Sequence, residues 1–170
     1  DIQRLSDYSE LDGELRDLER YGWVVFSSVN SVDVVFERLA AEGTDARALA
    51  GALVACIGKA TADRLRANGI AADLIPRAYV SESLVEAFDG VAVDGQRVLI
   101  PRAELGRDTL AKGLTERGAE VREVTAYRTV MPEGSRHLAE SAIAEGIDIA
   151  TFTSSSTVVN LYKLLDGDLT

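Results

Sequence analysis

The 170-residue sequence has little of what several common kinds of functional site require. It has one cysteine, Cys56, and one histidine, His137, so a disulfide framework, a Cys/His zinc site and a two-cysteine redox pair cannot be built from this chain alone. No apolar run approaches the roughly 20 residues that a membrane helix needs. The first residues, DIQRLSDYSELD, lack the basic start and apolar stretch of a signal peptide. We therefore expect a cytoplasmic protein that does not contact a membrane.

Positive charge is also scarce. Eighteen Lys and Arg residues against 28 Asp and Glu give a formal net charge of −10, and no stretch is rich in Lys or Arg. Because nucleic-acid phosphates are neutralised by clustered cations, we do not expect nucleic acid as a partner. What is present is ordinary for a globular protein, with 46% hydrophobic and 27% charged residues, and the length allows one or two small domains.

Short apolar runs that end in Gly or Ser alternate with amphipathic stretches, which is the pattern of βα units in a parallel sheet. Strands are predicted at residues 23–26, 53–57, 73–75, 97–100, 120–127 and 149–153. Helices are predicted at residues 11–20, 32–39, 60–67, 83–88, 105–117, from after Ser135 to about 144, and 158–165. The sequence therefore predicts an α/β fold with parallel sheets.

Residues 23–32 are similar to residues 149–158, and in both segments an apolar strand is followed by small polar residues and a helix. One explanation is that any two buried strand-to-helix joints look alike. The other is a pair of domains of related fold, the second beginning near Pro132. A second domain that begins there is incomplete in this chain, and its missing parts come from sequence outside the chain, from another chain or not at all.

Small polar residues follow four of the predicted strands. They are Ser27-Ser28, Gly58-Lys59-Ala60-Thr61, Pro101-Arg102-Ala103-Glu104 and Thr153-Ser154-Ser155-Ser156. In a parallel sheet these joints share the carboxyl edge, where ligands bind in open α/β folds, and each helix start offers unpaired N–H groups to an anion. Together the joints suit a polyanionic ligand. The alternative is that the residues only cap helices.

Other kinds of site are poorly supported. No GxGxxG follows a strand, and Gly51 is too far from Gly58-Lys59 for a phosphate loop, with Ala60 in the Ser/Thr position. His137 is predicted to be an exposed loop residue, and Cys56 a buried inert thiol. A flavodoxin-like mononucleotide binder stays a third hypothesis.

Five segments carry a more specific pattern: Phe26–Val32, Ile57–Ala62, Val98–Glu104, Val124–Val130 and Thr151–Ser155. In this order and spacing they resemble the uroporphyrinogen-III synthase family, and the resemblance extends over nearly the whole chain. It implies two flavodoxin-like parallel-sheet domains joined by a two-stranded linker, the second incomplete here. Residues 1–127 correspond to the inserted α/β domain, residues 128–134 to a linker strand and residues 135–170 to part of the second domain.

The resemblance also implies an activity. It is a hydro-lyase reaction that cyclises hydroxymethylbilane to uroporphyrinogen III with inversion of ring D, through a spiro intermediate and without a metal or organic cofactor. Tyr127 matches a tyrosine that can donate a proton to the departing hydroxyl; its alternative role is packing. The implied substrate-binding residues are Ser27, Ser28, Asn30, Gly58, Lys59, Ala60, Thr61, Arg102, Ser154 and Ser155.

The chain and its implied substrate are both strongly negative, so they repel each other at long range. We therefore expect Arg102, Arg128 and Lys59 to lie near the binding site. We expect a monomer whose partner is the small-molecule substrate, and we expect these 170 residues alone to be inactive. A non-catalytic ligand-binding or sensor module with the same binding site is the alternative function.

Overall fold

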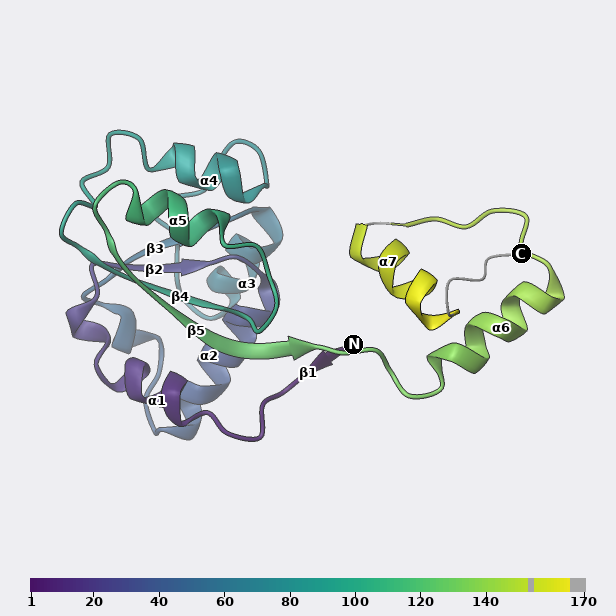
Figure 1. The fold of residues 1–170 in the computed structure, drawn as a ribbon. Coiled ribbons are helices and arrows are strands. Elements are labelled where there is room, and N and C mark those ends of the chain that lie inside the picture. The colour runs from purple at the N-terminus through teal and green to yellow at the C-terminus, as the bar shows by residue number, and fades with distance from the viewer. Residues whose placement is uncertain (153–154, 166–170) are drawn as a thin grey trace. The chain divides into compact units, whose positions relative to one another are not determined.

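The computed structural model describes residues 1–152 and 155–165, which form two compact units (Figure 1). One unit is Ile2–Thr129, and the other contains Asp1 and the chain from Val130 onward. Each unit is described by itself.

The larger unit is built on a five-stranded, mostly parallel sheet. Its strands are β1 (Ile2–Gln3), β2 (Trp23–Phe26), β3 (Leu53–Cys56), β4 (Arg97–Ala103) and β5 (Glu120–Thr129), in the order β1-β5-β4-β2-β3. The strands β2 to β5 pair in parallel, whereas β1 pairs antiparallel with the end of β5. The mixed α/β fold predicted from the sequence is confirmed.

Helices cover both faces of this sheet (Figure 1). They are α1 (Ser9–Arg16), α2 (Val29–Ala41), α3 (Lys59–Ala67), α4 (Ser81–Ala87) and α5 (Thr109–Thr115), with 3₁₀ turns at Leu18–Arg20 and Ala46–Leu49. Alternate residues of β2 point to opposite faces, so Val24 and Phe26 pack with α1, α2 and α3, whereas Trp23 and Val25 pack with α4 and α5. The two buried clusters explain why the strand residues are apolar throughout.

The predicted helices of this unit form for the expected local reasons. In α2, Val32, Val35 and Leu39 recur on one face and are fully buried, and the Ser28 side chain caps the helix by accepting from the Ser31 N–H. The helix α3 ends before Gly69, which adopts a left-handed φ of 85°.

The β4 region corrects two expectations. A strand-to-helix joint was expected at residues 101–104 and a helix from residue 105, but β4 continues to Ala103 and α5 begins at Thr109. The pairing of β4 with β2 ends at Leu99, so Pro101 lies where only β5 is bonded, and its missing N–H is tolerated. Arg102 is therefore a strand residue and does not lie at a helix start.

The strand predicted at residues 73–75 is also wrong, because only one isolated bridge, Ala55 to Leu74, is present. The Asp73 carboxylate accepts the Val54 N–H that a longer ladder would use, and Pro76 follows without a donor. The two-residue strand β1 was not predicted, since it is too short to show a periodic pattern.

The smaller unit contains α6 (Ser135–Glu145) and α7 (Ser155–Leu164). Residues 149–152, predicted as the start of a strand, form none, and Thr153 lies outside the described residues. A strand needs a hydrogen-bonded neighbour, and the described residues of this unit supply no second strand; Ile149 is 82% exposed. Among the residues described in both units, no helix is long and apolar enough to cross a membrane.

Candidate functional site

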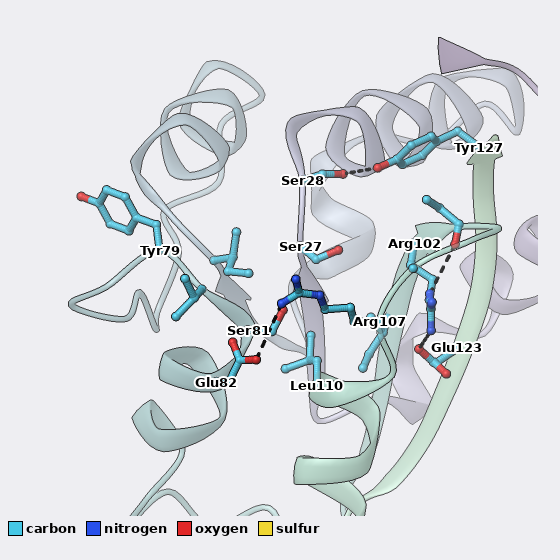
Figure 2. A pocket seen from close by; sticks show the side chains of 15 residues that line it. Ser27, Ser28, Tyr79, Ser81, Glu82, Arg102, Arg107, Leu110, Glu123 and Tyr127 are labelled. Carbon is cyan, nitrogen blue, oxygen red and sulfur yellow. Dashed lines mark hydrogen bonds and ion pairs between the residues drawn. The ribbon is translucent and has the colours of Figure 1, made fainter. Parts of the chain in front are cut away.

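A pocket of about 370 Å³ opens in the larger unit at the carboxyl ends of β2, β3 and β4 (Figure 2). This is the sheet edge where the sequence placed a ligand site. The lining comes from the β2–α2 joint, the residue after β3, the chain that enters α4, β4 with its following loop, α5 and β5. The lining residues are Ser27, Ser28, Ile57, Tyr79, Val80, Ser81, Glu82, Ile100, Arg102, Ala103, Gly106, Arg107, Leu110, Glu123 and Tyr127.

Ser28 and Tyr127 meet at one side of this pocket (Figure 2). The Tyr127 hydroxyl lies 3.0 Å from Ser28 Oγ, which also accepts the Ser31 N–H at 3.1 Å. Tyr127 is buried at the end of β5, and Ser28 is fixed as the cap of α2. The sequence named both residues, and the fold brings them into contact across 99 positions of chain.

Hydroxyl protons in this cluster have few possible arrangements. Ser31 Oγ donates to the Ser28 carbonyl oxygen at 2.8 Å, so it can only accept from Ser28 Oγ, which is 3.2 Å away. The single Ser28 proton goes either to Ser31 or to Tyr127. When it goes to Tyr127, the proton of the Tyr127 hydroxyl is available to a ligand in the pocket.

Arg102 lines the pocket, but its guanidinium already forms ion pairs with two carboxylates of the protein. Its side chain is 15% exposed, and one guanidinium nitrogen lies 2.5 Å from Glu123 and 3.2 Å from Asp108. Burial alone would lower the pKa of Arg102, but the hydrogen bonds that Arg102 donates to Glu123 and Asp108 outweigh it, and the net shift of that pKa is upward. Arg102 is therefore a permanent cation that links β4 to β5 and to the loop before α5.

The other two expected cations do not line the pocket. Lys59 is exposed and pairs with Asp63 at 2.5 Å, and Arg128 pairs with Glu104 at 2.9 Å. Of the three cations expected to lie together, only Arg102 lines this pocket.

The segment from Gly58 to Thr61 begins α3 as expected, but these residues are not among those that line the pocket. The Tyr79 ring packs against Gly58 so closely that a Cβ at that position would lie 3.0 Å from Tyr79 Cγ. Ala60 is exposed, whereas Thr61 is buried. Asn30 lies in the first turn of α2, two residues after the lining residue Ser28, and does not itself line the pocket.

Two predicted binding residues belong to the other unit. Ser154 lies outside the described residues, and Ser155 is the first residue of α7. His137 was expected in an exposed loop; it is exposed but lies within α6. Cys56 is fully buried as expected, and burial raises the pKa of its thiol.

Sequence reasoning missed five polar residues of the pocket: Tyr79, Ser81, Glu82, Arg107 and Glu123. Arg107 was assigned to a helix that in fact begins two residues later, and Tyr79 lies in a segment without a periodic pattern. The alternating polarity of β5 placed Glu123 on a strand but gave no sign of its partner. Only the fold identifies them.

Comparison with known proteins gives a consistent result. Residues 1–169 match the family model described as uroporphyrinogen-III synthase HemD. The chain is 36% identical over 166 residues to a uroporphyrinogen-III synthase from Synechococcus elongatus, covering 96% of this chain and 62% of that protein. It is 33% identical over 157 residues to a putative uroporphyrinogen-III synthase from Methanothermobacter thermautotrophicus, covering 88% and 59%. The chain thus spans about three fifths of the length of these relatives.

Solved structures show the same fold. A mutant uroporphyrinogen III synthase from Thermus thermophilus superposes with a TM-score of 0.73 at 21% identity, covering 98% of this chain and 66% of that one. The wild-type protein from the same organism gives a TM-score of 0.64 at 21% identity, covering 96% and 63%.

Proposed function

The chain belongs to the uroporphyrinogen-III synthase family, and from this premise we propose that the complete protein is a cyclising hydro-lyase that converts hydroxymethylbilane to uroporphyrinogen III. The observation that carries the proposal is the Ser28–Tyr127 pair in a pocket at the carboxyl edge of a parallel sheet. We further propose that the enzyme acts as a cytoplasmic monomer and uses no cofactor.

The proposed chemistry asks mainly for positioning. Once the bilane hydroxyl leaves, the electron-rich pyrrole rings react without further activation, and the protein must hold ring D so that its substituted carbon is attacked. Tyr127 donates a proton or a hydrogen bond to the departing hydroxyl. Ser28 supports this role, because a hydrogen bond from Ser28 to the Tyr127 oxygen leaves the Tyr127 proton facing the ligand.

The acid side chains of the substrate are held by helix starts. Ser27 and Ser28 line the pocket beside the first turn of α2, whose unpaired N–H groups and positive dipole end favour a carboxylate. Asn30 belongs to the same turn. We propose the start of α3, residues 58–61, as a second carboxylate site, and Ser154 and Ser155 as further substrate-binding residues.

The domain organisation is part of the proposal. Residues 1–127 form an inserted flavodoxin-like domain, residues 128–134 a linker strand, and residues 135–170 part of a second domain of the same kind. Chain entry and exit side by side support it: Ile2 pairs with Thr129, and Asp1 exchanges backbone hydrogen bonds of 2.7 and 2.9 Å with Val130. Neighbouring ends are what an inserted domain requires.

The test is an isomer assay on the complete protein supplied with hydroxymethylbilane, with the oxidised products separated chromatographically. We expect the ring-inverted III isomer, and we expect Tyr127→Phe to lower kcat about a hundredfold, the low end for a general acid, since the hydroxyl also leaves unaided. Tyr8→Phe, at the residue that precedes α1, is the matched control and should keep full activity. Binding of the bilane with formation of only the spontaneous uninverted isomer would refute the proposal and favour a sensor.

A further inference from the structure

A second charged pair lies in the pocket, apart from the Ser28–Tyr127 pair. Arg107, from the loop after β4, faces Glu82, from the first turn of α4, and a guanidinium nitrogen of Arg107 lies 4.0 Å from a carboxylate oxygen of Glu82 (Figure 2). The two residues come from different sides of the pocket. Their contact therefore lies across the space that a ligand would enter.

The two arginines of the pocket differ in how firmly they are held. Arg102 is bound by two carboxylates and mostly buried. Arg107 has a side chain that is 77% exposed, and its distance to Glu82 exceeds that of a direct hydrogen bond. An ion pair this exposed changes an equilibrium by at most about fivefold. Of the two arginines that line the pocket, Arg107 is therefore the one whose ion pair a ligand can replace.

The residues next to Arg107 in the sequence hold its loop in place and form no ion pair with its guanidinium. Arg102 lies under the loop that carries Arg107: a Cβ at Gly106 would lie 2.9 Å from an Arg102 guanidinium nitrogen, and Arg102 also pairs with Asp108. The residues on both sides of Arg107 are thus fixed against β4. The Arg107 side chain itself stays free to turn from Glu82 toward a ligand.

We propose that Arg107 binds an acid side chain of the substrate, and that Glu82 holds Arg107 in the unliganded pocket and is displaced when the substrate binds. This inference rests on the proposed function and assigns the substrate's carboxylates a side-chain partner. A guanidinium matches a carboxylate with two parallel hydrogen bonds, which the long contact to Glu82 does not provide. Displacement also separates Glu82 from an incoming carboxylate of the same charge.

The experiment uses the complete protein with Arg107→Gln, Glu82→Gln and the double variant. The readouts are the KM for hydroxymethylbilane and the Kd for uroporphyrin III, the fluorescent oxidised form of the proposed product. We expect Arg107→Gln to raise both constants about tenfold, as for a lost charge-assisted hydrogen bond. Glu82→Gln should lower both about threefold. In the Arg107→Gln background the gain from Glu82→Gln should vanish, because Glu82 acts through Arg107.

Matched controls make the same charge changes outside the pocket. Glu86→Gln lies one turn further along α4, and Arg47→Gln lies on the exposed turn after α2; both should leave KM and Kd within about twofold of wild type. Arg107→Lys keeps the positive charge but loses the planar guanidinium that can form two parallel hydrogen bonds. We expect its affinity to lie between those of Arg107→Gln and the wild type.

The outcomes separate this inference from the proposed function. If the wild type makes the III isomer but Arg107→Gln leaves KM and Kd unchanged, Arg107 has no such role. If the gain from Glu82→Gln persists in the Arg107→Gln background, Glu82 repels the ligand directly and the displacement is wrong. If the wild type makes no III isomer, the proposed function fails whatever the arginine variants do.

Discussion

Replacing Ser28 by Ala should cost about 2 kcal/mol of the free energy of unfolding, because two of the contacts of its hydroxyl stabilise the chain, the third being the longer 3.2 Å contact to Ser31 Oγ. The first is the cap on the Ser31 N–H, and Ser31 is fully buried, so water does not replace the lost acceptor. Loss of such a cap costs about 1 kcal/mol. The second is the hydrogen bond with Tyr127, which contributes about 1 kcal/mol.

A double-mutant cycle separates these contributions. Tyr127→Phe removes only the shared hydrogen bond and should cost about 1 kcal/mol, and the double variant should cost about 2 kcal/mol, as Ser28→Ala does alone. Urea unfolding of the 170-residue chain, followed by the fluorescence of its single tryptophan, the buried Trp23, measures all three values. Ser6→Ala, in an exposed bend, is the control and should change the stability by less than about 0.5 kcal/mol.

Additive losses would refute the reasoning. If the double variant loses about 3 kcal/mol, Ser28 and Tyr127 do not share a hydrogen bond in solution. A loss below about 0.5 kcal/mol for Ser28→Ala would show that neither contact stabilises the chain.

Three further predictions concern the face of the sheet that α1 and α2 cover. Arg38→Met should cost about 3 kcal/mol in urea unfolding, since it leaves the 7%-exposed Asp12 without its two 2.8 Å hydrogen bonds; a loss below about 1 kcal/mol would contradict this. Burial alone would raise the pKa of Glu14, but hydrogen bonds from Tyr21 and Arg122 outweigh it and lower that pKa. Its contribution to stability is therefore present above pH 4.5 and lost as the pH falls through the lowered pKa, so Glu14→Gln should flatten the acid limb of a stability–pH curve. Burial, followed by the hydrogen bond to Glu14, raises the pKa of Tyr21 to about 12, so its contribution is complete below pH 10 and lost as the pH rises from 10 to 12. Tyr21→Phe should remove that alkaline loss, and an unchanged slope would refute the assignment.

Much of the fold could be predicted because local and tertiary preferences agree. Trp23–Phe26 is apolar without interruption, as a strand buried on both faces must be, and the apolar spacing of α2 matches its buried face. The position of Ser28 in the pocket lining could be predicted because Ser28 lies between the end of a buried strand and the start of a helix.

The remainder depends on contacts between distant residues. Nothing near Arg102 in the sequence indicates that its guanidinium forms an ion pair with Glu123, which lies 21 positions later. The residues 149–152 have the composition of a strand, but composition does not supply a neighbouring strand. Arg107, in the loop after β4, and Glu82, in the first turn of α4, meet because of how these two segments pack, so periodicity gives no information about their contact.

The central claim is that acid groups of a tetrapyrrole bind at the carboxyl edge of the larger unit, and amide chemical shifts test it most directly. In the complete protein titrated with uroporphyrin III, we expect the largest shifts at residues 28–31 and 104–108, which border the pocket. A hollow of about 460 Å³ elsewhere in the same unit, lined by Leu15, Leu39 and Thr44 among others, serves as an internal control and should be unaffected. Shifts concentrated at that hollow, with none at residues 28–31, would contradict the account.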